Sequence, residues 1–97
     1  MPQIDAGWLD RTLQELVRIN SINPTLDPRA AGEREISEYI ATSLGALGLD
    51  GAIHDLGPGR ASVVGRLRGS APGRTLMLNA HIDTVDVEGM AAPFSGD

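Results

Sequence analysis

The chain has 97 residues, a net charge of −5 and no cysteine, and these facts exclude several classes of function. Disulfide scaffolds, thiolate zinc sites, iron–sulfur clusters and thiol nucleophiles all need a sulfur that the chain lacks. All eight basic residues are arginines, which also excludes Schiff-base catalysis and the phosphate-binding lysine of a P-loop. With 13 acidic residues, no basic run and only three aromatic residues, nucleic acid is not an expected partner.

Size and composition predict one small soluble domain. A chain of this length buries roughly 60–65% of its unfolded surface, and 41% hydrophobic with 22% charged residues is typical of a globular protein. No apolar stretch approaches the roughly 20 residues that span a bilayer. Residues 1–10 also lack the basic and apolar regions of a signal peptide. We therefore expect a cytoplasmic protein with no membrane partner.

Two segments in the first half of the chain predict helices. The segment 8–19 carries an apolar stripe with helical spacing, formed by Leu9, Leu13, Leu16 and Val17. Asp5 is its expected N-cap. Prolines interrupt the pattern over 20–30, which is predicted to be a loop. A second helix is expected over 31–47, ended by Gly48 as the residue after its C-cap.

Three short extended runs follow, over 52–56, 61–68 and 74–80, and predict a three-strand meander. The Pro-Gly segments between them, at 57–59 and 69–73, predict turns. The middle run alternates apolar and polar residues, which is typical of a strand with one solvated face. The last run contains Leu-Met-Leu without a break, so both of its faces are expected to be covered. Such a strand, in a chain with only two helices, indicates a sheet that needs more protein around it.

The residues best placed to carry chemistry follow the last predicted strand. His81 and Asp83 are two residues apart, so in an extended chain their side chains point the same way. That spacing suits a metal-binding histidine whose second ring nitrogen is held by a carboxylate. An ordinary ion pair at a strand end is the alternative. The position, at the end of a buried strand, is one where α/β sheets place their ligands.

Other polar residues are weaker candidates. His54 adjoins Asp55, so the two side chains point to opposite faces and His54 is expected to be a solvated strand residue. A solvated face that complements the helix dipole is expected for the acids near the start of the second helix, Glu33, Glu35 and Glu38. Three later acids could bias a pocket toward cations: Asp86, Glu88 and Asp97.

Several segments together carry a family resemblance. They are LVRINSINP at 16–24, Gly-Glu at 32–33, SVVGRL at 62–67, LMLNAHIDTV at 76–85, EGM at 88–90 and PFSGD at 93–97. In order and spacing they resemble the start of the acetylornithine deacetylase, succinyl-diaminopimelate desuccinylase and aminoacylase family of zinc metallohydrolases. The resemblance covers nearly the whole chain. Two departures are Ala80 and Asp86, where the family commonly has glycine and proline.

The resemblance implies that residues 1–97 form the N-terminal, incomplete portion of an α/β, zinc-exopeptidase-like catalytic domain. It implies a two-metal amidohydrolase, with Zn²⁺ or sometimes Co²⁺, that acts on small N-acyl amino acids or peptides. His81 would be a ligand of one metal, and Asp83 would orient it. The other ligands and the general base are expected downstream, so the 97-residue chain alone would be inactive. Many relatives are homodimers.

The alternative to this enzyme is a small non-catalytic α/β fragment or interaction module without a metal site. In that case His81 and Asp83 would serve only structure or partner binding. The two hypotheses differ in what lies beyond the His-x-Asp pair, because one histidine cannot hold a catalytic metal that needs about three protein ligands.

Overall fold

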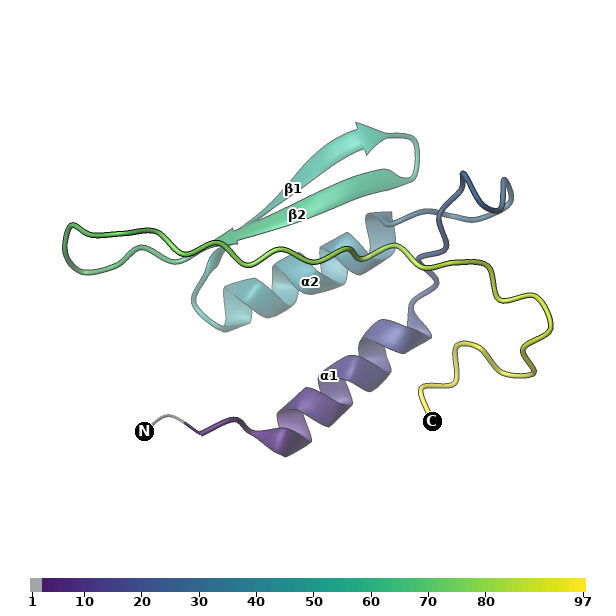
Figure 1. Cartoon of the computed structure of the whole chain (residues 1–97), viewed down its shortest axis with the longest axis horizontal. Helices are drawn as coiled ribbons and strands as arrows, with labels where there is room; N and C mark the ends of the chain where they lie inside the picture. The colour runs from purple at the N-terminus through teal and green to yellow at the C-terminus, as the bar shows by residue number, and fades with distance from the viewer. Residues whose placement is uncertain (1–2) are drawn as a thin grey trace.

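The computed structural model describes residues 3–97 and contains two helices and one pair of antiparallel strands. Their order is α1 (Ala6–Arg18), α2 (Arg34–Ala46), β1 (Asp50–Gly57) and β2 (Arg60–Arg66). The prediction of a small α/β fold is confirmed. In Figure 1, α2 lies between the β1–β2 hairpin and α1. Within residues 3–97, neither helix has the length and apolar character needed to cross a membrane.

Helix α1 begins where the sequence predicts, because the Asp5 side chain accepts a hydrogen bond from the Trp8 backbone N–H at 2.9 Å. Its predicted apolar stripe, in contrast, is not covered. No residue of α1 is buried, and the side chains of Leu9 and Leu13 are 51% and 59% exposed. The helix therefore forms from local signals, while most of its apolar stripe stays exposed and only Leu16 is half-buried.

Helix α2 ends as the sequence predicts. Gly48 has a φ of 88°, in the left-handed region that suits glycine. Its N–H donates to the Gly45 carbonyl at 3.0 Å, and the next N–H, of Leu49, donates to the Leu44 carbonyl at 2.9 Å. These two bonds form a Schellman motif, which satisfies the last carbonyls of the helix and turns the chain into β1.

Strands β1 and β2 pair in the antiparallel register that places Ile53 opposite Val63. The turn between them contains Pro58 and Gly59, and Gly59 has a φ of 71°. The first two predicted strands and the turn that joins them are therefore confirmed. Helix α2 packs against both strands of this hairpin.

The third predicted strand is wrong. Residues 74–80 are not part of any strand, and the described chain contains a two-stranded sheet rather than a three-strand meander. Their apolar side chains are not covered on either face: Leu76, Met77 and Leu78 are 77–86% exposed. In Figure 1 the chain reverses beyond β2 and returns as an extended trace. A strand needs neighbouring backbone to accept and donate its ladder hydrogen bonds, and no part of residues 3–97 supplies it here.

The buried residues gather at one end of the molecule, where the loop after α1, the first turns of α2 and the start of β2 meet. They are Ser21, Ile22, Gly32, Glu33, Ile36, Ser37 and Ala61. The other residues in the range 3–97 are half-buried or exposed. The accessible surface of the chain, 7799 Å², exceeds the about 5,300 Å² typical of a compact monomer of this mass. The radius of gyration, 15.5 Å, likewise exceeds the about 12.5 Å expected for a compact domain of this length.

Candidate metal-binding site

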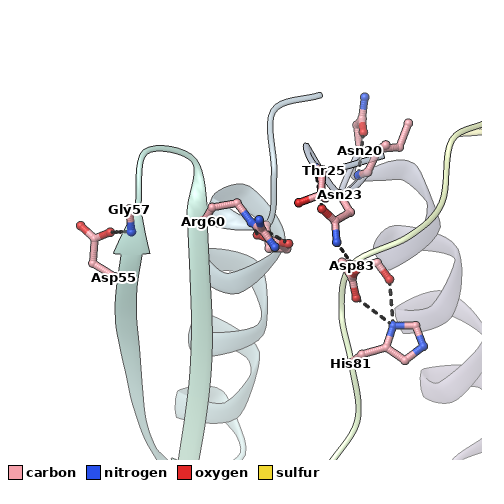
Figure 2. Close-up of polar contacts among 10 residues, drawn as sticks. Asn20, Asn23, Thr25, Asp55, Gly57, Arg60, His81 and Asp83 are labelled. Atoms are coloured by element: carbon pink, nitrogen blue, oxygen red, sulfur yellow. Dashed lines mark hydrogen bonds and ion pairs between the residues drawn. The ribbon is translucent and has the colours of Figure 1, made fainter. Parts of the chain in front are cut away.

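His81 and Asp83 are brought together in the segment that follows the unpaired run (Figure 2). The His81 Nδ1 atom lies 3.0 Å from the Asp83 Oδ1 atom and 2.9 Å from the Asp83 backbone oxygen. The side chain of His81 is 84% exposed, whereas that of Asp83 is 32% exposed. The two side chains therefore face each other, as their spacing in the sequence predicts, with the histidine ring directed to solvent.

The partners of His81 determine which ring nitrogen carries the proton. A backbone carbonyl and an ionised carboxylate oxygen can only accept hydrogen bonds. Because Nδ1 faces one of each, Nδ1 must be the protonated nitrogen that donates to them. In the neutral imidazole this leaves the lone pair on Nε2, which is the nitrogen then free to bind a metal ion.

Asn23 is a third member of this cluster, and the sequence reasoning missed it. Its Nδ2 atom donates to the second carboxylate oxygen of Asp83, Oδ2, at 2.9 Å. This hydrogen bond, more than the neighbouring His81, holds the pKa of the Asp83 carboxyl below its ordinary value. The available signal was the Asn23-Pro24 pair, which is typical of a turn and says nothing about a partner 60 residues away.

Backbone hydrogen bonds attach the loop of Asn23 to the segment of Asp83. Ile22 and Thr84 form an isolated parallel bridge. The Asn23 N–H donates to the Thr84 carbonyl at 2.9 Å, and the Thr84 N–H donates to the Ser21 carbonyl at 3.0 Å. Ser21 and Ile22 are both buried. The short segment that carries His81 and Asp83 is thus held against a buried part of the loop.

Ala80 occupies the position before the histidine where the resembled family commonly has glycine. No residue other than glycine has a positive φ anywhere in residues 3–97. The backbone of Ala80 therefore lies in a region that any residue adopts, and the alanine imposes no strain on the approach to His81.

His54 lies on β1, opposite Ser62, and is exposed as predicted. The neighbouring Asp55 points away into contacts of its own. It accepts a hydrogen bond from the Gly57 N–H at 2.9 Å and pairs with Arg34 at 3.1 Å. The two histidines therefore differ in environment: only His81 has a recorded carboxylate partner.

The prediction of a solvated face is wrong for Glu33, although Glu35 and Glu38 are exposed as expected. Glu33 is 4% exposed, and both of its carboxylate oxygens accept from the Nε atom of Arg60, at 2.8 and 3.1 Å. The reason is a tertiary contact at the start of α2: the Glu33 N–H donates to the carbonyl of Gly59 in the hairpin turn at 2.9 Å. That contact brings the adjoining arginine to the carboxylate.

The Glu33 carboxylate is the main cause that raises the pKa of Arg60, and the charge of Asp83 adds a smaller contribution. Arg60 therefore stays protonated beside the cluster. Figure 2 shows its side chain extending from the start of β2 toward the side on which Asn23 and Asp83 lie. A fixed positive charge is thus part of the surroundings of the Asp83 carboxylate.

The later acids do not complete a metal site. Asp86 and Glu88 line an open hollow of about 410 Å³ together with Asp27 and Arg29, and Asp97 is not part of that hollow. Among residues 3–97 there is no group of three or more histidine or carboxylate side chains arranged to hold a metal ion. His81, with its ring oriented by Asp83, offers one nitrogen ligand.

In comparisons with known proteins, no family model, curated protein or solved structure matches the chain. The protein is a small α/β chain in which a carboxylate orients a histidine.

Proposed function

We propose that residues 1–97 belong to the N-terminal part of the catalytic domain of a two-metal amidohydrolase. Its substrates would be small N-acyl amino acids or peptides, as the resemblance to the acetylornithine deacetylase and aminoacylase family implies. The observation that carries the proposal is the geometry at His81. The Asp83 carboxylate and backbone oxygens occupy Nδ1, so the lone pair of the neutral ring is on Nε2.

The residues present fit one ligand position of a zinc or cobalt site. An imidazole nitrogen is a common zinc ligand, and metal-bound histidines usually donate their other N–H to a carboxylate or backbone carbonyl. Such ions, when bound, would supply Lewis-acid chemistry: they would lower the pKa of a coordinated water and polarise the scissile carbonyl. The part of this chain is to present Nε2 of His81 and, through Asp83, to keep that ring in a fixed orientation.

The remaining ligands and the general base would come from further protein. A catalytic zinc needs about three protein ligands, and residues 3–97 bring one histidine to the site. The exposed surfaces support this part of the proposal. Residues 76–78 are almost fully exposed, although their sequence is that of a strand covered on both faces, and the apolar stripe of α1 is open. Additional strands and helices of a larger domain would cover both.

The experiment uses the complete catalytic domain and compares two histidine variants. His81→Ala is expected to lower the zinc content measured by elemental analysis and to remove most of the amidohydrolase activity on N-acetyl amino acids. His54→Ala is the matched control, because His54 is exposed on β1 and has no carboxylate partner. It should change neither quantity. Equal zinc content and equal activity in the two variants would overturn the proposal, as would metal-dependent turnover by the 97-residue chain alone.

One observation favours a second candidate, a non-catalytic α/β module. Within the described chain no cluster of three metal-ligating side chains exists, and the His81–Asp83 contact by itself is also a typical ion pair. The same comparison separates the two functions. A module without a metal would show no zinc above background in the unsubstituted protein and no loss in His81→Ala.

A further inference from the structure

We infer that Asn23 is a positioning residue for His81: by fixing the Asp83 carboxylate, it fixes the ring orientation and the Nδ1–H tautomer that leave Nε2 for a metal ion. The role of the tautomer in metal binding rests on the proposed function, whereas the effect of Asn23 on the His81 ring follows from the hydrogen bonds alone. Asn23 belongs to the loop before α2, and its side chain hydrogen-bonds Asp83 and Thr25 rather than His81. It acts on the histidine only through Asp83.

The orientation of the Asn23 amide is determined by its own surroundings. Its Oδ1 atom accepts the Thr25 backbone N–H at 2.8 Å, as in an Asx turn. With the oxygen held there, the Nδ2 group must face the opposite side, where it donates to Asp83 Oδ2 at 2.9 Å. A flipped amide would lose both bonds, because it would place a donor against an N–H and an acceptor against a carboxylate.

The backbone of Asn23 is fixed as well. Its N–H donates to the Thr84 carbonyl at 2.9 Å, and its carbonyl accepts the N–H groups of Leu26 and Asp27 at 3.0 and 3.1 Å. Backbone and side chain of one residue therefore hold the two segments together. The donor that reaches Asp83 starts from a point that cannot shift without breaking several hydrogen bonds.

As a consequence, the two carboxylate oxygens of Asp83 accept hydrogen bonds from two different side chains. Oδ2 accepts from Asn23, and Oδ1 accepts from His81 Nδ1 at 3.0 Å. Without the Asn23 donor, the His81 ring is the one side chain left that hydrogen-bonds the Asp83 carboxylate. The carboxylate, which is partly exposed, can then rotate about its side-chain bonds together with that ring. The Asp83 backbone oxygen, 2.9 Å from His81 Nδ1, would remain as an acceptor. The expected effect on the ring is therefore partial.

Two variants test this inference. Asn23→Ala removes the donor and the turn acceptor together. Asn23→Asp keeps the size of the side chain and an oxygen for the Thr25 N–H, but replaces the donor facing Asp83 by an acceptor. The control is Asn20→Ala in the same loop. The Asn20 side chain accepts the Ile22 N–H at 3.1 Å and has no recorded contact with Asp83.

The first measurement is the nitrogen chemical shifts of the His81 ring in the metal-free 97-residue chain, at a pH well above the ordinary histidine pKa of about 6.5. Both Asn23 variants are expected to lower the share of the Nδ1–H tautomer, and Asn20→Ala is expected to leave it unchanged. An unchanged tautomer in Asn23→Asp overturns the inference, whether or not Asn23→Ala folds. Equal shifts in the Asn20 and Asn23 variants overturn it too.

The second measurement is the zinc dissociation constant of the complete catalytic domain. Asn23→Asp should weaken binding about 10-fold, at the low end of the range for residues that orient a ligand, with a smaller effect of Asn20→Ala. An unchanged constant in Asn23→Asp counts against the inference. Absence of zinc binding by the unsubstituted domain would instead overturn the proposed function, and the tautomer result would still decide the role of Asn23.

Discussion

Replacing Gly32 by alanine should detach the start of α2 from the hairpin turn. Gly32 precedes α2 with a φ of 86°, and a Cβ atom added there would lie 2.2 Å from the carbonyl oxygen of Gly59. Ordinary van der Waals contact begins at 3.4 Å. The opposing atom is backbone, so it cannot rotate away as a side chain does. That same carbonyl accepts the N–H groups of Glu33 and Arg34, at 2.9 and 3.2 Å.

The expected loss of stability has two parts. Holding a non-glycine residue in the left-handed region costs about 1–2 kcal/mol. Moving the Gly59 carbonyl by more than an ångström breaks the two hydrogen bonds that it accepts, each worth about 0.5–1.5 kcal/mol. Together they give a loss of roughly 2–5 kcal/mol. That is a large part of the about 5–15 kcal/mol typical of a whole domain.

Urea unfolding followed by circular dichroism measures this loss, and two other glycines separate its parts. Gly48 also has a positive φ, but nothing lies within 4 Å of its added Cβ, so Gly48→Ala should cost only about 1–2 kcal/mol. Gly45 lies inside α2 with the same open space, and Gly45→Ala should stabilise the chain by about 0.5–1 kcal/mol. Equal losses in Gly32→Ala and Gly48→Ala would refute the reasoning, because the contact with Gly59 would then cost nothing to displace.

Three further predictions concern side chains. Under the proposed function, Asp83→Ala should raise the zinc dissociation constant of the complete domain by about 10–100-fold without abolishing binding, as a metal titration would show. Hydrogen bonds from backbone N–H groups lower the pKa values of two carboxyl groups: Arg29 donates to Asp27, and Gly57 donates to Asp55. Each carboxylate therefore stabilises the fold at a pH above its unfolded pKa of about 3.9. This stabilisation is lost as the pH falls through the pKa of the folded state. Urea midpoints measured from pH 6 down to about pH 3 should fall, and should fall less in Asp55→Asn. The Tyr39 hydroxyl donates a hydrogen bond to Glu15, and this bond raises the pKa of Tyr39. The bond therefore stabilises the fold below the unfolded tyrosine pKa of about 10, and this stabilisation is lost at higher pH. In Glu15→Gln, tyrosinate absorbance should appear at a lower pH.

The elements that the sequence predicted correctly depend on neighbours close in the chain. Asp5 caps α1 through a residue three positions away, and Gly48 ends α2 through bonds to the last turn of the same helix. The β1–β2 hairpin follows in the same way from its Pro-Gly turn. Such signals act before tertiary structure exists, and they remain valid whatever else packs against the chain.

Residues 74–80, which were predicted to be a strand, have no neighbouring strand to pair with among residues 3–97. A continuous apolar run is typical of a strand that is buried on both faces, but such a strand forms only where another strand supplies its hydrogen bonds. The same holds for the stripe of α1, which the sequence assigned correctly to one helix face and which stays exposed. Periodicity predicts which side chains share a face, and it does not predict that the face is covered.

At the candidate site, the spacing of His81 and Asp83 predicted their contact because side chains two residues apart in an extended chain point the same way. Asn23 and Glu33 could not be found in this way. Their partners, Asp83 and Arg60, are 60 and 27 positions away, and both contacts follow from how the loop and the helix start pack. A polar residue near a helix start is most often solvated, and only the tertiary contact with the hairpin turn reverses this for Glu33.

The support of His81 does not involve residues 74–80, which form no strand. Residues 74–80 are unpaired and exposed, yet the next residues are fixed again, because Thr84 bonds to the buried Ser21 and to Asn23. The ring orientation is therefore a property of the loop and not of a completed sheet. Under the proposed function, further protein would supply the other ligands, but it is not needed to place Nδ1 of His81 against Asp83. For this reason the tautomer of His81 should be the same in the 97-residue chain and in the complete domain; a different tautomer in the two would mean that the sheet, rather than Asn23, orients the ligand.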